Sequence, residues 1–570
     1  MKKLLFWGSL AVIGASLTSC DDFLDDNRDP MSQQTVNSTF WSNPVNVENQ
    51  LNYFYETFVG YGNGTALGNF YFTTMSDDQS GQYGGTFRNW KYTSVPTSSS
   101  SWNSPYTEIR RANLVIEGVS GSTMTEADQK GYLAIARLFR AYNYYLLVRA
   151  YGDVPLIKGV VDVDNSDALY GPRTARAEVM DYALEDLNYA VENIPTQSSK
   201  TQFSKDLANA MKAEICLFEG TYSIYVAKNN ERGKKYLNEV VNSCNAIMAG
   251  GYSIGDYALL YNSHNGALTS HPEVILAKCY QQGVFMHSTV DWTSGSTPIA
   301  GISKDAFDSF LFIDGKPKAT TSENTDDAGV IDATGKLSIA AQLAVRDKRL
   351  AATIYDHIMY QDCPYQVGNT SNMTSTSGYG IKKYNDNVTH SLSDATTANK
   401  NYNDAPIYWL AEIYLAYAEA KAELGTLTDD DLDKTINKLY TRAGLPTQTV
   451  AGLNAINDPA NNMGVSSLIW EIRRCRRCEL MLDNDIRYWD LIRWGKLELC
   501  DTKKYPNVVL GANLKNATVD FAKTAEGYMD PRSELYGGLD RVYDKKYDLY
   551  PIPSEERALN PNLTPNPGWE

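Results

Sequence analysis

The stretch AIARLFRAYNYYLLVRAYGDVP occupies residues 134–155 and carries the clearest structural pattern of the chain. Its apolar residues recur at the three- and four-residue spacing of an α-helix. A helix that is apolar on two adjacent stripes must pack between other elements. Gly152 and Pro155 follow directly, as such residues commonly do at helix ends. The two stripes consist of Ala134, Leu138, Ala141, Tyr145 and Val148, and of Ile135, Phe139, Tyr142 and Leu146.

Similar patterns predict more helices later in the chain. They cover residues 180–194, 211–222 and 233–249, and later 407–418 and 432–439. Paired helices of this length, with alanines at the contacts, are typical of helix–turn–helix repeats of the tetratricopeptide kind. We therefore expect repeats at about 104–250 and 405–445.

Long stretches rich in Gly, Ser, Thr, Asn, Tyr and Trp separate these helices, at about 60–103, 280–300, 365–404 and 500–545. Loops of this length in a compact protein are usually functional or disordered. Their aromatic content argues against disorder. The sequence thus predicts a mainly α fold, with helix pairs, long irregular loops and small β elements.

The composition narrows the range of partners. The 570 residues include 52 Lys and Arg against 68 Asp and Glu, which gives a net charge of −16. Such a surface repels phosphate backbones, so we expect no nucleic-acid binding. The 39 Tyr, 10 Trp and 16 Phe residues suit binding surfaces that are both apolar and wet, although most of them should be packing.

The first twenty residues have the pattern of an export signal. Lys2 and Lys3 precede an apolar run from Leu4 to Leu17, which is shorter than the ~20 residues that a membrane span needs. The small residues before Cys20 resemble the lipobox of bacterial lipoproteins. That resemblance implies a signal peptide over residues 1–19 and a lipid, such as palmitate, on Cys20. The acidic pairs Asp21-Asp22 and Asp25-Asp26 resemble the surface-export signal of Bacteroidetes lipoproteins, so we expect a lipid-anchored protein of the outer membrane, exposed on the cell surface.

Seven further cysteines and an arginine run have structural explanations. Cys475 and Cys478 form a C-x-x-C, but no second pair completes a zinc site, and both fall on one helical stripe. We expect them in the core. The run from Arg473 to Arg477 lies between Glu471 and Glu479, which favours ion pairs or contact with a partner over nucleic-acid binding.

Eight strings, in order along the whole chain, resemble the SusD/RagB family of Bacteroidetes surface lipoproteins. The block from Glu479 to Lys496 is the most distinctive, because it contains Arg487-Tyr-Trp-Asp490-Leu-Ile-Arg493-Trp494. The cysteines at 475 and 478 depart from the family pattern. The other strings are Cys20–Asp25, Trp102–Asn113, Arg137–Pro155, His271–Ile275, Asp404–Ala420, Arg442–Pro446 and Tyr550–Gly568.

The resemblance implies one SusD-like domain over residues 20–570, with tetratricopeptide-like units on one side and ligand-binding loops on the other. It also implies a partner, a SusC-like TonB-dependent transporter, to which the lipoprotein delivers oligosaccharides. No catalytic residues, cofactor or metal are implied.

A glycan site needs flat rings for the apolar faces of sugars and planar polar groups for their hydroxyls. The first loop, residues 77–90, and the second, residues 280–292, have this composition. A third loop could extend the platform, and Asp77-Asp78 could instead hold Ca²⁺, although the loop lacks a standard calcium pattern. His287 is interpreted as a surface histidine with no catalytic partner. The predicted ligand-binding residues are Trp90, Trp292, Tyr83, Arg88, Asn89, Asp78 and Tyr280, with Tyr379, Lys383, Tyr384 and Tyr402 from the third loop.

The leading hypothesis is a non-enzymatic glycan-binding lipoprotein. An oligopeptide-binding relative is the first alternative. A glycoside hydrolase is the second, since it needs only two suitably placed carboxylates, which 68 acidic residues can neither supply nor exclude. A scaffold without a small ligand is the third. No G-x-S-x-G, H-E-x-x-H or P-loop string supports other chemistry.

Overall fold

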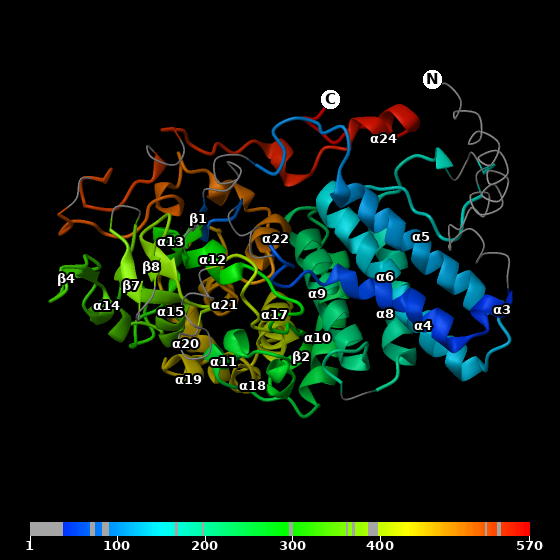
Figure 1. The fold of residues 1–570 in the computed structure, drawn as a ribbon, viewed down its shortest axis with the longest axis horizontal. Coiled ribbons are helices and arrows are strands. Elements are labelled where there is room, and N and C mark those ends of the chain that lie inside the picture. The colour runs from blue at the N-terminus through cyan, green and yellow to red at the C-terminus, as the bar shows by residue number, and fades with distance from the viewer. Residues whose placement is uncertain are drawn as a thin grey trace, which may run out of the picture.

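The computed structural model describes residues 38–68, 75–81, 90–162, 164–165, 169–196, 199–295, 300–360, 363–367, 371–385, 397–518, 521–532 and 537–570. Helices dominate these residues, and the strands are short (Figure 1). The predicted mainly α class, with small β elements, is confirmed.

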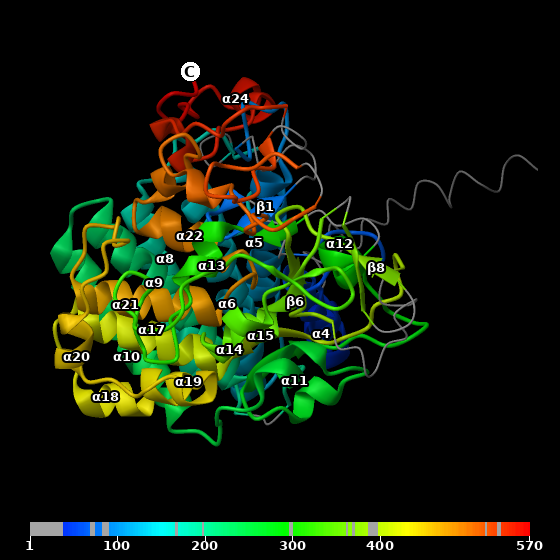
Figure 2. The same ribbon diagram turned by 90° about the vertical axis from the view of Figure 1, so that its left-hand side faces the viewer.

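Long helices pack in pairs and form the scaffold. Helix α5 contacts α6, α6 contacts α8, and α9 contacts α10, which in turn contacts α17. Helix α17 also packs against α21, and both views show these later helices side by side (Figures 1 and 2). Their bounds are α5 Ser100–Ser120, α6 Glu126–Tyr151, α8 Arg176–Asn193, α9 Lys205–Tyr225, α10 Asn230–Met248, α17 Leu410–Glu423 and α21 Ser467–Glu479.

Helix α6 shows how the local sequence produces this scaffold. The Thr125 hydroxyl caps its N-terminus by accepting the amide hydrogen of Asp128 at 3.2 Å. Gly152 ends it with φ +74°, which only glycine adopts without strain. The predicted end at Gly152 is confirmed. The first apolar stripe is buried, whereas Tyr142 and Leu146 of the second are only half-buried.

Short helices fill the spaces between the long ones. Before α5 lie α3 Ser38–Trp41, α4 Pro44–Asn52 and the 3₁₀ turn η1 Tyr53–Thr57. The middle of the chain contains α11 Tyr257–Asn262, η4 Ala267–Ser270, α12 Thr289–Ser294, α13 Lys304–Ser309, α14 Ala340–Ala344 and α15 Lys348–Thr353. The last part contains α18 Asp429–Lys434, α19 Ile436–Ala443, α20 Val450–Ala455, α22 Ile486–Arg493, η5 Leu497–Cys500, η6 Pro506–Val508, η7 Lys545–Asp548 and α24 Ser554–Leu559.

The strands form small antiparallel sheets. Strand β1 (Gln79–Gly81) pairs with β3 (Ala300–Ile302), and β2 (Val274–Lys278) pairs with β10 (Ala405–Trp409). Strand β7 (Tyr365–Val367) pairs with β8 (Ser371–Met373). The largest sheet has the order β4-β5-β6-β9, from β4 (Val330–Ile331), β5 (Leu337–Ser338), β6 (Ile354–Ile358) and β9 (Tyr379–Ile381).

One helix boundary was predicted wrongly. Ile407 fits the helical spacing of Ala411, Tyr414 and Ala418, yet it lies on β10, and α17 begins at Leu410. The strand is fully buried and pairs with β2. Its apolar residues therefore pack around a sheet strand and not along one face of a helix. Periodicity alone does not separate a buried strand from the start of a buried helix.

The arginine run is buried and paired, as the ion-pair interpretation predicted. Arg474 contacts Asp458 and Glu471, while Arg477 contacts Asp78 at 2.7 Å. Burying such charges is tolerable only because each has a close opposite charge. Within the described part of the chain, no helix is long and apolar enough to cross a membrane.

Candidate functional site

A cavity of about 600 Å³ lies where the first helix pair meets the later helices. Its walls come from η1, α5, α6, β10, α17 and the segment that leads into α22. Small-molecule sites commonly have volumes of ~300–1,000 Å³. The cavity is therefore large enough for a short oligosaccharide or a ligand of similar size.

Helix α5 supplies a hydroxyl-rich wall. Ser100, Ser104 and Thr107 line the cavity at three- and four-residue spacing, so they share one face of the helix. All three are exposed to solvent. Tyr53 on η1 also lines the cavity, and its ring is 48% exposed with the Arg111 guanidinium 4.2 Å from the ring centroid. This side can offer both hydrogen bonds and an aromatic face to a ligand.

Helix α6 forms another wall of the cavity with part of its second apolar stripe. Tyr142, Leu146 and Arg149 follow at spacings of four and three residues, and all line the cavity. Each is half-buried, with part of its side chain toward the cavity. The two-stripe pattern therefore describes one buried face and one cavity face.

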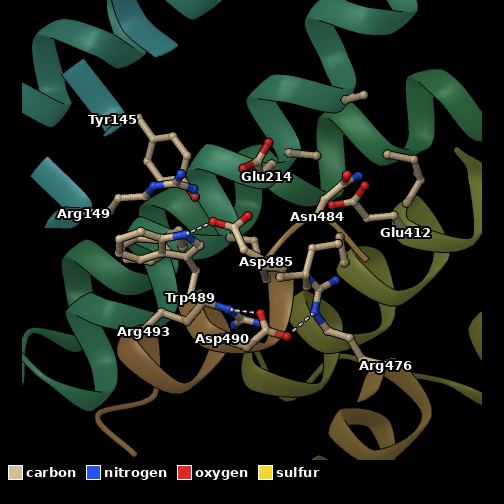
Figure 3. Close-up of a pocket in the computed structure, with 17 residues that line it drawn as sticks. Tyr145, Arg149, Glu214, Glu412, Arg476, Asn484, Asp485, Trp489, Asp490 and Arg493 are labelled. Atoms are coloured by element: carbon tan, nitrogen blue, oxygen red, sulfur yellow. Dashed lines mark hydrogen bonds and ion pairs between the residues drawn. The ribbon is translucent and has the colours of Figure 1, made fainter. Parts of the chain in front are cut away.

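The inner end of the cavity adjoins a chamber of about 40 Å³. Space of this size holds only water-sized groups, since one water needs ~10–15 Å³. The two spaces share Arg149, Glu214, Glu412, Asn484, Asp485, Ile486 and Trp489 as lining residues. Figure 3 shows the side chains of Glu214, Asp485 and Glu412 gathered around the chamber, with Arg476 on its other side.

Hydrogen bonds fix several of these charged groups. The Trp489 indole donates to Asp485 Oδ2 at 2.7 Å, and the Tyr408 hydroxyl donates to Glu214 Oε2 at 2.5 Å. The Arg149 guanidinium lies 4.2 Å from the centroid of the Trp489 ring. A cation over an indole face is favourable, and the stacking holds the arginine beside the chamber.

Two carboxyl groups of the site have raised pKa values. Burial, assisted by the charge of Glu214, raises the pKa of Glu412 to about 8. Burial also raises the pKa of Asp485 to about 6, although Arg149 and the Trp489 hydrogen bond act in the opposite direction. Perturbed groups of this kind are concentrated at functional sites.

The backbone before α22 has an unusual conformation. Leu482, Asn484 and Asp485 have φ values of +72°, +42° and +54°. Asn and Asp tolerate this left-handed region better than other side chains, whereas leucine does not. Strained backbone is often found where a segment positions functional groups, and here it directs Asn484 and Asp485 to both spaces.

The structure does not place Trp90 on an exposed platform. Its ring is 6% exposed, its indole donates to the Val542 carbonyl at 2.9 Å, and it stacks on Tyr547 at 4.9 Å. The composition of this loop predicted a ligand-binding ring, but Trp90 instead anchors the C-terminal segment.

Asp78 and Tyr280 are also buried, contrary to the predicted ligand contacts. Asp78 accepts a hydrogen bond from Arg477 Nε at 2.7 Å, and the neighbouring Asp77 is held by Arg487, so the pair is a poor calcium site. Tyr280 donates to the Gly62 carbonyl at 2.8 Å. The third-loop residues Tyr379, Lys383, Tyr384 and Tyr402 are buried too, and so is His287, which was expected at the surface.

Trp292 differs from these residues. It lies on α12, is half-buried, and its indole nitrogen has no hydrogen-bond partner among the described residues. It remains a candidate ligand contact outside the cavity. Tyr83, Arg88, Asn89 and Cys20 lie outside the described residues, so these predictions are untested.

Sequence reasoning missed the acidic residues of the chamber. Glu412 stands in a mostly apolar helix, LAEIYLAYAEA, whose other acid, Glu419, pairs with Arg493, and Glu214 stands in the mostly apolar α9. A lone acid on a buried helix face costs free energy unless it serves a purpose or has a partner. That pattern was the available signal for this site.

The cavity is polar and bears aromatic rings, and comparison with known proteins shows the family to which the chain belongs. The model of the SusD family matches residues 272–569, and a model described as "Starch-binding associating with outer membrane" matches residues 22–217. The chain therefore belongs to the SusD family, as the motifs predicted.

Individual relatives agree with this assignment. A SusD-like protein of Bacteroides ovatus is 33% identical over 125 residues, which are 21% of this chain and 22% of that relative. The SusD-like protein P38 of Formosa agariphila is 33% identical over 121 residues, or 23% of its length. The matched parts thus span less than a quarter of these relatives.

Solved structures share the fold. A SusD-like carbohydrate-binding protein of Bacteroides fragilis has a TM-score of 0.69 at 21% identity, with 92% of this chain and all of that chain covered. A laminarin-binding SusD-like protein has a TM-score of 0.54 at 18% identity, with 92% of this chain covered.

Proposed function

We propose that this protein binds glycans at the cell surface, anchored by a lipid on Cys20, and passes oligosaccharides to a SusC-like TonB-dependent transporter. Membership of the SusD family supports glycan binding, and one family model is named for association with the outer membrane. The fold is shared with a carbohydrate-binding protein and with a laminarin-binding protein.

The observation that carries the proposal is the 600 Å³ cavity with a hydroxyl-rich wall on α5 and aromatic rings on η1 and α6. Sugars present apolar C–H faces and many hydroxyls, and therefore need rings together with hydrogen-bonding groups. Tyr53 and Tyr142 supply the rings, and Ser100, Ser104 and Asn143 supply hydrogen bonds. A peptide groove would instead need a row of main-chain donors and acceptors.

The test is glycan binding by variants of the cavity wall. Tyr142→Ala removes a half-buried ring, and such a ring contributes ~1 kcal/mol, so glycan affinity should fall about fivefold. Trp292→Ala tests the loop contact separately. Tyr170→Ala, which removes an exposed ring outside the cavity, is the matched control. Affinity electrophoresis on a panel of polysaccharides, followed by calorimetry on the retained ones, gives the measurement.

The outcomes separate the alternatives. If no glycan retards the protein but peptides bind, the sugar assignment is wrong and the oligopeptide alternative is favoured. If Trp292→Ala abolishes binding and Tyr142→Ala does not, the loop site carries the function and the cavity does not.

The lipid anchor is tested separately: Cys20→Ala should release the protein from the membrane fraction. The transporter should co-purify with the anchored protein in mild detergent.

A hydrolase remains the second candidate because of one feature, the raised pKa of Glu412 beside Glu214. Glycosidases use two carboxyl groups ~5–9.5 Å apart, and one has a raised pKa to act as the acid. Release of reducing sugar from a bound glycan by pure protein, and its loss in Glu412→Gln, would support this function. Binding without any release of reducing sugar supports the non-enzymatic glycan-binding role.

A further inference from the structure

The inner chamber is lined by more carboxyl groups than guanidinium groups. Four carboxyl groups and three guanidinium groups line it. Arg493 is neutralised outside the chamber by Glu419, with two N–O distances of 2.7 Å. Arg476 pairs with Asp490 at 2.8 Å, and Arg149 faces Asp485. Glu214 and Glu412 are therefore left without a matching cation.

These two residues also have unused hydrogen-bonding capacity. Glu214 accepts one hydrogen bond, from Tyr408, through Oε2 alone. Glu412 is 7% exposed, and no hydrogen bond or ion pair joins it to another described residue. A buried carboxylate without partners is costly, so the chamber favours a donor that carries positive charge.

A buried donor aims into the same space from the other side. Arg476 is 5% exposed, and its Nη1 has no hydrogen-bond partner among the described residues. Because Nε is taken by Asp490, Nη1 is the group left to meet a ligand. An unpaired buried donor costs free energy that an acceptor on the ligand would recover. The chamber thus presents acceptors for a cation and a donor for an oxygen (Figure 3).

The size of the space restricts the cation. Within the described ranges, no three His, Cys, Asp or Glu side chains converge closely enough to hold a metal ion. A space of about 40 Å³ admits an ammonium group but not a sugar ring. The ring would have to stay in the larger cavity, which α5 and α6 both line.

We infer that the chamber receives the protonated amine of an amino sugar, placed between Glu214 and Glu412, while an adjacent hydroxyl oxygen of the same sugar accepts a hydrogen bond from Arg476. This inference rests on the proposed glycan-binding function and names the class of sugar that the cavity prefers. The ligand is a glycan or oligosaccharide with a free amino group, and N-acetylation would remove the charge that the chamber recognises.

Proton release on ligand binding can be measured, and a Glu412 with only a structural role would not produce it. Burial and the Glu214 charge raise the pKa of Glu412 to about 8, so this group holds a proton near neutral pH. An entering ammonium favours the ionised form of Glu412, so the carboxyl group releases its proton when the ligand binds. The titratable and charged groups that face Glu412 from the surrounding elements are Tyr142, Tyr145 and Arg149 on α6, Glu214 on α9, Tyr408 on β10, Arg476 on α21, Asp483 and Asp485 before α22, and Asp490 and Arg493 on α22.

The experiment compares glucosamine, glucose and N-acetylglucosamine as probes of the full-length protein at pH 6.5. At this pH an amine with pKa ~7.7–8 is almost fully protonated. Ligand-observed NMR gives the affinities, and calorimetry in buffers of different ionisation enthalpy gives proton release. We expect glucosamine to bind about tenfold more tightly than glucose, with release of part of one proton, since a charge-assisted hydrogen bond exceeds a neutral one by about this factor.

Two variants test the assignment to the chamber. Glu412→Gln keeps the shape but removes the charge, so the preference for glucosamine and the proton release should both disappear. Asp485→Asn keeps the left-handed backbone and an acceptor for Trp489, and should weaken glucosamine binding without abolishing glucose binding. Glu185→Gln, an exposed glutamate on α8, is the control and should bind like the wild type. Thermal unfolding verifies that each variant is folded.

Equal binding of glucose and glucosamine by the wild type overturns the inference, even where polysaccharides still bind and the proposed function stands. Tighter binding of glucuronate than of glucosamine overturns it as well. Glucosamine binding that depends on Glu412, without retention by any polysaccharide, supports the chamber and contradicts the proposed glycan function.

Discussion

Arg487 donates two hydrogen bonds to Asp77, from Nε and from Nη2, each at 2.7 Å. The two residues are 410 positions apart, and both are buried. Arg477 donates one hydrogen bond from Nε to the carboxylate of the next residue, Asp78, at 2.7 Å. These contacts attach the first long loop to the helices α21 and α22, and they explain why the acidic pair contributes to the fold and not to a ligand site.

Removing one partner of this pair should destabilise the protein strongly. Burial alone would raise the pKa of Asp77, but Arg477 and Arg487 hold it well below its usual value. Asp77→Ala leaves Arg487 without its close partner, whereas Arg477 keeps Asp78 and Asp305, and an unpaired buried charge costs ~3–5 kcal/mol. Urea unfolding measures the loss. The exposed Asp162→Ala should change stability by less than ~0.5 kcal/mol, and an equal effect of both variants would contradict this explanation.

Two helix glycines should respond oppositely to the same change. A Cβ at Gly118 on α5 would lie 2.3 Å from the Trp41 ring, whereas a Cβ at Gly131 on α6 would have nothing closer than Pro195 at 3.9 Å. Gly118→Ala should therefore cost ~1–3 kcal/mol through overpacking. Gly131→Ala should gain up to ~1 kcal/mol, because alanine is the better helix former. Melting temperatures measure both effects. An unchanged melting temperature for Gly118→Ala would show that the close approach of Trp41 on α3 to α5 is not needed for stability.

The helical scaffold could be predicted from the sequence because helix periodicity and end signals are local. Residues 134–155 already contain the stripes, the glycine end and the proline of α6. Ile407 shows the limit, since pairing with a distant strand overrode a helical spacing. Local sequence patterns carry no information about contacts with residues that are far away in sequence.

The binding residues were harder to predict for the same reason. Trp90 and Asp78 have the composition of a binding loop, but Val542 and Arg477 bury them through contacts hundreds of residues apart. Glu214 and Glu412 lie on different helices, and only the packing of α9 against α17 brings them to one chamber. The composition of the loops predicted the kind of site, whereas the position of the site depends on tertiary contacts.

The cysteines should behave as core residues and not as a metal or redox site. Cys475 and Cys478 are buried, and burial raises their pKa values to about 12 and about 11. Thiolates are the reactive form, so both should resist alkylation at pH 7 in the folded protein. Mass spectrometry after a short pulse of iodoacetamide should find label at the half-buried Cys363 and Cys279 first. Rapid native labelling of Cys475 would show that α21 opens locally.

Glu412 should make stability depend on pH with a predictable sign. Its pKa is about 8 in the folded protein, compared with 4.5 for an ordinary glutamate. Between these values the folded state holds a proton that the unfolded state releases, so the free energy of unfolding falls as pH rises from about 4.5 to about 8. Asp485 adds to the fall at lower pH, because its folded pKa of about 6 also lies above its ordinary value.

Glu412→Gln carries no titrating proton and should lose most of this dependence. Its free energy of unfolding should exceed that of the wild type at pH 8.5 by on the order of 2 kcal/mol, since water in the adjoining cavity screens part of the full linkage. At pH 5 the two proteins should differ little, because the wild-type carboxyl group is then protonated in the folded state. Glu185→Gln, with its side chain in solvent, should follow the wild-type curve. Parallel curves for the wild type and Glu412→Gln across this range would show that Glu412 is ionised in the folded protein, and that the chamber already contains a cation to neutralise it.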